Sequence, residues 1–206
     1  MGLILASASP RRAALLREAG YAFQVVPADA DESVVGAEGA EAYVRRVALL
    51  KARAVQALMP DDVVLAADTT VVVDGEMLAK PKDDDDARRM LARLSGRAHV
   101  VLTGVAVVSG AGEMAAVVSS TVRFRTLTPA DLAWYVATGE PADKAGAYAV
   151  QGLGGRFVAS VEGSYSNVVG LPMDEVTGLL EAAGVAQPVR AAGAPDGRSP
   201  SAFDPS

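Results

Sequence analysis

The chain has no cysteine and a single histidine, His99. The absence of cysteine excludes disulfides, thiolate zinc sites, iron–sulfur clusters and a cysteine nucleophile. One histidine allows a histidine-based triad but cannot supply a metal site built from several histidines. Any metal that the chain binds is therefore expected to be a hard cation held by carboxylates, water and phosphate oxygens, and Mg²⁺ and Mn²⁺ fit that description.

Long hydrophobic runs are also missing, although 50% of the residues are hydrophobic. The apolar segments 63–67, 71–73 and 100–108 are bounded or interrupted by Asp, Thr or Gly, and each is shorter than the ~18 residues of a membrane-spanning helix. No basic segment precedes the first apolar residues, as it would in a secretory signal. We therefore expect a cytoplasmic protein without a membrane partner.

An excess of positive charge is absent too, since the formal net charge is −6. General nucleic-acid binders usually present a basic face and a high isoelectric point, so the acidic balance argues against a nucleic-acid partner. The alternative is a nucleic-acid surface built from Arg11, Arg12, Lys51 and Lys80. That alternative predicts salt-sensitive oligonucleotide binding.

Strand-like and helix-like segments alternate along the chain, which predicts an α/β fold. Helices are expected over 11–19, 40–59, 81–96, 128–137 and 174–183, and strands over 2–6, 21–26, 63–67, 70–73, 99–108, 115–126, 157–161 and 168–169. On the second helix, the expected apolar stripe is Tyr43, Val47, Leu50, Ala54 and Leu58. We predict one domain over 1–186 and a disordered tail over 187–206, where Pro, Gly, Ala and Ser dominate.

A helix start near the N-terminus is the first candidate for ligand binding. Ser9 followed by Pro10 is typical of an N-cap with proline in the first turn. The free N–H groups and positive dipole end of such a helix, together with Arg11 and Arg12, would suit a phosphate. The alternative is an ordinary capped helix with two solvated arginines.

Asp68 lies between the two predicted strand segments 63–67 and 70–73, in a context rich in Val and Ala. A carboxylate is costly to bury unless it is paired or bound to a metal, so Asp68 is a candidate metal ligand or general base. Lys80 follows the turn at Asp74 and Gly75 and could fold back toward Asp68. The alternatives are a turn aspartate and a solvated surface lysine.

Two acidic segments are further candidates for a metal site. The loop with Asp29, Asp31 and Glu32 could supply metal ligands or could be a solvated loop. The run 83–86 is better explained as a first helical turn whose acids complement the helix dipole and pair with arginines one turn later. Lys51, on the predicted 40–59 helix, could reach a phosphate, although a surface lysine is the plainer interpretation.

A glycine cluster at 152–155 allows close backbone approach to a ligand. Its spacing matches neither the nucleotide-binding loop that ends in Gly-Lys-Ser/Thr nor the dinucleotide fingerprint. The amide of the preceding Gln151 both donates and accepts hydrogen bonds and could read the edge of a base. His99, on an apolar strand, is interpreted as structural rather than catalytic.

The order of these motifs resembles the Maf family of nucleoside triphosphate pyrophosphatases. The resemblance runs from Leu3 to Leu180 and is carried by LASASPRR at 5–12, ADT at 67–69, KP at 80–81, LSG at 94–96, TG at 103–104, ATGEPADKAGAYAVQG at 137–152 and NVVGLP at 167–172. It implies an elongated, mixed and twisted sheet flanked by helices, with two lobes and a central cleft, as in ITPase-like folds. It also implies hydrolysis of a nucleoside triphosphate to the monophosphate and pyrophosphate, with Mg²⁺ or Mn²⁺ as cofactor.

The resemblance also assigns roles to individual residues. Asp68 corresponds to the proton acceptor, with Lys51 and Lys80 as further catalytic residues and Glu32 as a second metal ligand beside Asp68. Substrate binding and specificity would fall to Ser9, Arg12, Thr69 and Gln151.

Within the family, the chain is similar to the branch that prefers dTTP and UTP. The branch associated with 7-methyl-GTP has an aromatic residue at the position of Arg11, Gln at that of Thr69 and Glu near Gln151. Thr70 departs from the first branch, which usually has Ile or Val there.

The resemblance further implies roles in cell division arrest and in keeping non-standard nucleotides out of nucleic acids. The alternative is a nucleotide-binding regulator of septum formation that acts without turnover. The expected partner is a nucleoside triphosphate, and a second copy of the chain, forming a homodimer, is a further candidate.

Overall fold

A computed structural model describes residues 1–186, and the predicted tail 187–206 lies outside these residues. The prediction of one domain over 1–186 stays a prediction. The helices are α1 Pro10–Glu18, α2 Ala40–Gln56, α3 Asp84–Leu94, α4 Pro129–Ala137, α5 Tyr165–Val169 and α6 Met173–Ala182. The strands are β1 Leu3–Leu5, β2 Gln24–Val25, β3 Val63–Val73, β4 Glu76–Leu78, β5 Ala98–Ser109, β6 Gly112–Phe124 and β7 Val158–Glu162. Short 3₁₀ turns at Glu140–Asp143, Ala145–Ala147 and Leu153–Phe157 join α4 to β7.

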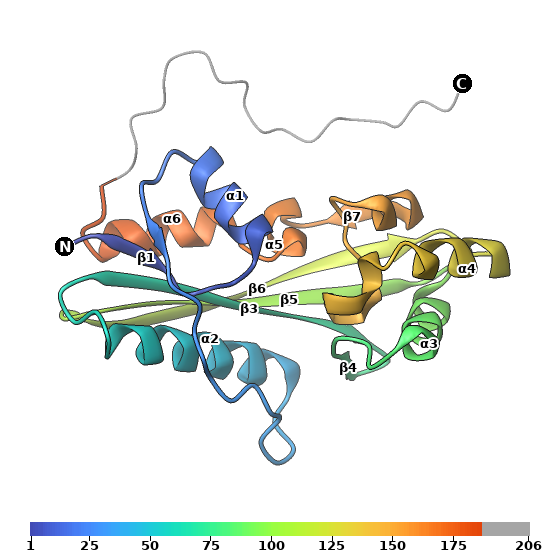
Figure 1. Ribbon diagram of the computed structural model, residues 1–206, viewed down its shortest axis with the longest axis horizontal. Helices are drawn as coiled ribbons and strands as arrows, with labels where there is room; N and C mark the ends of the chain where they lie inside the picture. The colour runs from blue at the N-terminus through green and yellow to red at the C-terminus, as the bar shows by residue number, and fades with distance from the viewer. Residues whose placement is uncertain (187–206) are drawn as a thin grey trace.

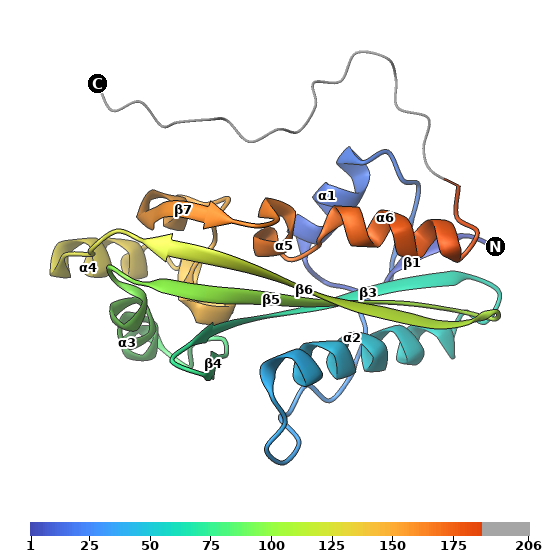
Figure 2. The same ribbon diagram turned by 180° about the vertical axis from the view of Figure 1, so that it is seen from behind.

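One mixed, twisted sheet runs the length of the molecule in the order β2-β1-β3-β5-β6-β7, with β4 paired to β3. α2 covers one face of the sheet, while α1, α5 and α6 cover the other (Figures 1 and 2). α3 and α4 pack at the end of the sheet opposite the N-terminus (Figure 1). The expected α/β fold with an elongated mixed sheet is therefore confirmed.

The hydrophobic core is divided between the two ends of the sheet. One cluster joins α3 and α4 to the far ends of β3, β5 and β6, with Leu91, Phe124 and Tyr135 among its most buried members. Two others lie on opposite faces of the near end, one under α1 and α6 and one under α2. The expected two-lobed arrangement follows from this division.

β3 is one continuous strand, and the predicted interruption at Asp68 and Thr69 is wrong. β3 pairs with β5 residue by residue from Val64 to Val72, so backbone pairing continues through the two polar residues. A polar pair inside a strand is tolerated here because each side chain finds its own partner on an opposite face of the sheet.

The other edge of β3 has a gap in its pairing. β1 pairs with β3 only at Val63–Leu65, and β4 pairs with it only at Val71–Val73. Among the described residues, no strand pairs with 66–70 on that side. The chain leaves β1 at this point and turns into α1, so the gap lies beside the start of a helix.

Two further local predictions are wrong. Residues 168 and 169 belong to helix α5 rather than to a strand, because the Ser164 side chain accepts from the backbone N–H of Asn167 and caps a helical turn. The buried face of α2 includes Val47 but otherwise differs from the expected stripe, and Leu58 is exposed. The buried residues of α2 are Val44, Val47, Ala48, Lys51, Ala52 and Val55.

α2 can lie close to the sheet because β5 has a glycine beneath it. A Cβ atom at Gly104 would overlap the carbonyl oxygen of Val44 on α2. Small alanines on the helix and a missing side chain on the strand thus allow close backbone approach. This close approach brings the Lys51 side chain to the level of β3. In the chain as far as it is described, no helix is long and apolar enough to cross a membrane.

We predict that Gly104→Ala lowers the free energy of unfolding by about 3 kcal/mol, because the added methyl group meets backbone rather than a side chain that can move. Gly110→Ala is the control, since a Cβ at Gly110 has open space around it. Urea denaturation of both variants measures the difference. Equal stability of the two would contradict the close packing of α2 on β5.

Candidate functional site

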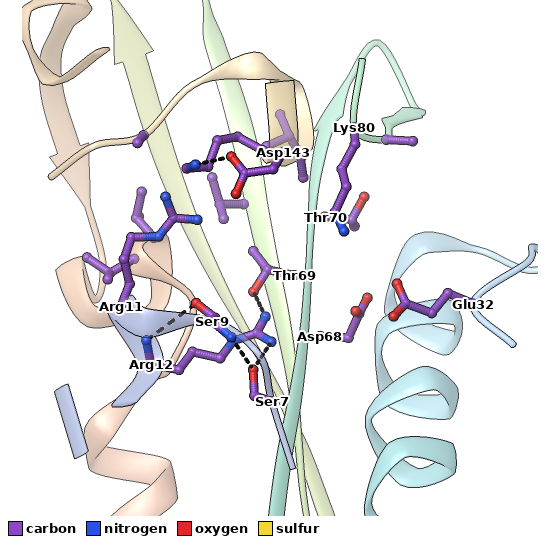
Figure 3. Close-up of a pocket in the computed structure, with 18 of the residues that line it drawn as sticks. Ser7, Ser9, Arg11, Arg12, Glu32, Asp68, Thr69, Thr70, Lys80 and Asp143 are labelled. Carbon is purple, nitrogen blue, oxygen red and sulfur yellow. Dashed lines mark hydrogen bonds and ion pairs between the residues drawn. The ribbon is translucent and has the colours of Figure 1, made fainter. Parts of the chain in front are cut away.

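A cavity of about 1050 Å³ opens at the gap in the pairing of β3. Its walls come from the turn between β1 and α1, the middle of β3, the loop that carries Glu32, the segment after β4 and the segment around Asp143 (Figure 3). Seven of the predicted site residues line it: Ser9, Arg12, Glu32, Lys51, Asp68, Thr69 and Lys80. The exception is Gln151, which is exposed and lies outside the residues that line the cavity.

Asp68 and Lys51 form a buried ion pair on the α2 side of β3. The Asp68 Oδ1 atom lies 2.7 Å from the Lys51 Nζ atom, and the residues are only 7% and 8% exposed. Glu32 approaches the same ammonium, with 2.9 Å between its Oε1 and Nζ. The expectation that Lys51 by itself is a surface lysine is therefore wrong, because α2 places it on the buried face.

Burial raises the pKa of the Asp68 carboxyl, and the nearby Lys51 and Arg12 only partly oppose that effect. The Tyr43 hydroxyl lies on the same side of the site and donates to the backbone oxygen of Glu32, at 3.0 Å. Burial and then the charge of Asp68 raise the pKa of Tyr43 to about 12. Tyr43, Val47 and Lys51 share one side of α2 at a spacing of four residues, a signal that could have marked Tyr43 as a site residue.

The paired carboxylates of Asp68 and Glu32 are the candidate ligands of a divalent cation. Each uses one oxygen within 3 Å of Lys51 Nζ, so the two carboxylates lie close together, and the second oxygen of each has no partner among residues 1–186 (Figure 3). Within residues 1–186, no group of three or more acidic or histidine side chains could hold a metal. Two carboxylates nevertheless suit Mg²⁺, which usually retains water and takes further oxygens from substrate phosphates.

Arg12 is occupied by the protein itself. Its guanidinium donates to the backbone oxygens of Gly170 and Ala67, each at 2.8 Å, to Ser7 Oγ at 3.2 Å and to Thr69 Oγ1 at 3.0 Å. Burial lowers the pKa of Arg12, and Asp68 opposes this. Four of its five N–H groups are used. Arg12 therefore ties α1 to the uncovered edge of β3 and to the end of α5, and it retains one donor for a ligand.

Arg11, unlike Arg12, has all of its guanidinium N–H groups available to a ligand in the cavity. It lines the cavity, and it makes no hydrogen bond or ion pair with any residue from 1 to 186. The N-cap predicted at Ser9 is confirmed, since its hydroxyl accepts from the Arg12 N–H at 3.5 Å, and Pro10 is the first helical residue. No acidic residue lies in the first turn of α1, so its positive end faces the cavity without a counter-charge from that turn.

The opposite wall carries two more cations. Lys80 follows β4, is exposed and extends toward the cavity near Thr70 (Figure 3). The expected approach of Lys80 to Asp68 is not made as an ion pair in the described structure. Lys144 also lines the cavity and pairs with Asp143. Sequence reasoning missed this pair, although both residues belong to the motif that carries the family resemblance.

The glycine cluster at 152–155 is not an open backbone surface. The Glu140 carboxylate accepts from the N–H groups of Leu153 and Gly154, each at 3.2 Å. A Cβ at Gly152 would overlap this carboxylate. The close approach that the glycines allow is therefore made by Glu140, and Gln151 stands on the outside of the turn that results.

His99 is buried on β5, and its Nε2 lies 2.8 Å from the Tyr148 hydroxyl. Its ring packs edge-on against Phe124 and Tyr148. Burial lowers the pKa of His99 to about 4. The imidazole is therefore neutral near pH 7 and belongs to the aromatic core behind the cavity, as the structural interpretation of the sequence expects.

The chain is similar in sequence and fold to known proteins. A family model described as "Maf-like protein" matches residues 2–183. A dTTP/UTP pyrophosphatase from Anaeromyxobacter sp. (strain Fw109-5) is 59% identical over 94% of this chain and 95% of its own length. A protein of the same name from Myxococcus xanthus (strain DK1622) is 54% identical over 92% of this chain and 96% of its own length. A solved dITP/XTP pyrophosphatase from Mycobacterium abscessus covers 90% of this chain and 96% of its own, with 15% identity and a TM-score of 0.44.

The two adjacent arginines should respond differently to the same substitution. Arg12→Met removes four hydrogen bonds and leaves buried acceptors unpaired, so we predict a loss of about 3 kcal/mol in the free energy of unfolding. Arg11→Met should change it by about 0.5 kcal/mol or less. Denaturant unfolding of the two proteins measures this. Equal losses would show that Arg12 does not have the anchoring role assigned to it.

His99 should make the stability depend on pH. Its pKa is depressed in the folded state, so the unfolded chain takes up a proton first and stability falls as the pH drops from 6.5 to about 4. The fall attributable to this group is about 3 kcal/mol. Urea denaturation of wild type and His99→Phe across this range should show a shallower pH dependence in the variant. The same pH slope in both proteins would be inconsistent with a neutral buried imidazole.

Proposed function

This chain belongs to the Maf-like protein family, and on that premise we propose that it hydrolyses dTTP and UTP to the nucleoside monophosphate and pyrophosphate. The relatives named dTTP/UTP pyrophosphatase match it over nearly its whole length. The observation that carries the proposal is the buried Asp68–Lys51 pair at the gap in β3, which faces a cavity lined by cations. A base and a positive phosphate site in one cavity suit hydrolysis of a phosphoanhydride.

The triphosphate would bind between the two walls of the cavity. On one wall, the free N–H groups at the start of α1 and the Arg11 guanidinium supply positive charge. On the other wall, Lys80 supplies an ammonium. Arg12 contributes one remaining N–H and otherwise fixes the position of α1. We therefore assign the direct phosphate contact to Arg11 in preference to Arg12.

Asp68 and Glu32 would hold a divalent cation, Mg²⁺ or Mn²⁺, together with the phosphates. When bound, the cation would neutralise negative charge on the phosphate oxygens. Both carboxylates also contact Lys51, which holds them in place and compensates their charge. Tyr43 fixes the backbone of Glu32 from the same helix.

Asp68 is the proposed proton acceptor. A water molecule in the cavity would give a proton to the Asp68 carboxylate while its oxygen attacks the α-phosphorus. The bond from the α-phosphorus to the oxygen that bridges it to the β-phosphate then breaks, which releases pyrophosphate. The raised pKa of Asp68 makes it a stronger base than an ordinary aspartate. Direct attack by water needs no covalent intermediate with the protein and is the simplest route.

The pyrimidine base would bind on the other face of β3. Side chains alternate across a strand, so Asp68 faces α2 while Thr69 faces the opposite side of the sheet, where Arg12 donates to it (Figure 3). The lining on that side is largely apolar, with Val101, Val168 and Tyr148. An apolar wall with a few polar groups is typical of a small-molecule binding site and would suit a base. The role of Gln151 in reading the base stays a prediction.

Asp68→Asn should lower the turnover of dTTP and UTP about a thousandfold, because the amide cannot accept the proton of water. Release of pyrophosphate and monophosphate, measured with Mg²⁺, with Mn²⁺ and with EDTA, tests this. Asp74→Asn, at the residue that follows the same strand, is the control and should retain wild-type rates, because Asp74 is not among the residues that line the cavity. Wild-type rates from Asp68→Asn would refute the mechanism.

A further inference from the structure

A chain of hydrogen bonds runs from Arg12 through two threonines to the backbone of α5. Arg12 Nη2 lies 3.0 Å from Thr69 Oγ1, which lies 2.9 Å from Thr103 Oγ1. Thr103 Oγ1 in turn donates to the backbone oxygen of Asn167, at 3.1 Å. Thr69 and Thr103 are directly paired residues of β3 and β5. Thr103 is fully buried, whereas Thr69 is half-buried and lines the cavity.

The direction of each hydrogen bond follows from the chemistry of its end groups. A guanidinium can only donate and a carbonyl oxygen can only accept. The single Thr103 proton is used on the Asn167 carbonyl, so the Thr69 hydroxyl must donate its own proton to Thr103. Thr69 also accepts from Arg12. Its proton is therefore used inside the protein, and one lone pair is left for a ligand.

The backbone carbonyl of Asn167, where this series of hydrogen bonds ends, is held in place by other contacts. The Asn167 side chain donates to the backbone oxygen of Val101 at 3.1 Å and to Ser120 Oγ at 2.9 Å. The same carbonyl also accepts from the N–H of Gly170, at 2.9 Å. The acceptor that sets the orientation of Thr103 therefore does not depend on a ligand.

We propose that Thr103 is a positioning residue that keeps Thr69 a hydrogen-bond acceptor toward the substrate base and so favours uracil and thymine over cytosine. This proposal rests on the proposed function and on the placement of the base on the Thr69 face of β3. The ring N3–H of uracil or thymine donates a hydrogen bond, which a lone pair on Thr69 can accept. The N3 atom of cytosine is itself an acceptor, so it would face a second lone pair. Thr103 would thus affect base selectivity through Thr69, without contacting the base.

Thr103→Val and Thr103→Ser separate this role from packing. Valine has nearly the shape of threonine but leaves the Thr69 hydroxyl free to turn and donate. We expect Thr103→Val to lower the ratio of kcat/KM for dTTP to that for dCTP about tenfold, mainly through KM for dTTP, because one hydrogen bond distinguishes the bases. Thr103→Ser retains the hydroxyl and should keep the wild-type ratio. A wild-type ratio in Thr103→Val would overturn the proposal.

A double-mutant cycle shows whether Thr103 acts through Thr69. In a Thr69→Val background, which lacks the hydroxyl to be oriented, adding Thr103→Val should leave the dTTP to dCTP ratio unchanged. A further loss of the same size in that background would mean that Thr103 affects selectivity by another route and would overturn the proposal. Thermal unfolding midpoints of all four proteins check that each is folded.

If Thr103→Val does not fold, a substrate analogue replaces it. Wild type should discriminate between UTP and 3-methyl-UTP, which lacks the N3–H, and Thr69→Ala should lose most of that discrimination. Undiminished discrimination in Thr69→Ala would contradict the acceptor role of Thr69. Failure of the proposed function is distinguishable, since wild type would then release no pyrophosphate from dTTP or UTP at all.

Discussion

The middle of β3 is the constraint on which the site depends. Residues 66–70 pair with β5 on one side, while the part of the chain that the structure describes offers them no strand on the other. An uncovered strand edge leaves backbone groups without partners, and Arg12 meets part of that need by donating to Ala67. Because a side chain rather than a strand covers the edge, space remains for a cavity beside it.

The alternation of side chains along the same segment then divides the cavity chemically. Asp68 faces α2 and meets Lys51 and Glu32, which makes one side charged. Thr69 faces α1 and α5 and meets Arg12, with an apolar lining around it. Adjacent residues of one strand thus place a carboxylate beside Lys51 on one side of the sheet and a hydroxyl beside Arg12 on the other. The close packing of α2 over Gly104 fixes the charged side relative to β3. The hydrogen bonds of Arg12 fix α1 on the other side.

Local sequence patterns predicted the parts of this arrangement that depend on neighbours in the chain. The N-cap at Ser9 and the α/β alternation follow from short-range rules, and the structure has both. The use of Arg12 by the protein could not be predicted in this way, because its acceptors lie 55 and 158 residues away in the sequence. For the same reason Lys51 looked like a surface lysine. Its partner Asp68 is seventeen residues away, on another element.

The continuous β3 strand was missed because two polar residues in an apolar run usually indicate a turn, and only their partners on α1 and α2 show otherwise. The family resemblance predicted more of the site than local patterns did, because it identifies residues that line the cavity without knowledge of their contacts. It did not distinguish an arginine that contacts substrate from one that supports the fold. The hydrogen bonds show that Arg12 is bound to the protein itself, and this is the ground on which the phosphate contact is proposed for Arg11.

The most direct test of this account is a crystal structure with Mg²⁺ and the α,β-imido analogue of dUTP. The account predicts the triphosphate in the gap of β3, in contact with the start of α1, Arg11 and Lys80, while Arg12 keeps its bonds to Ala67 and Gly170. It also predicts the uracil on the Thr69 face. A complex in which Arg12 leaves those carbonyl groups to bind phosphate, or in which the nucleotide lies away from the gap, would contradict it.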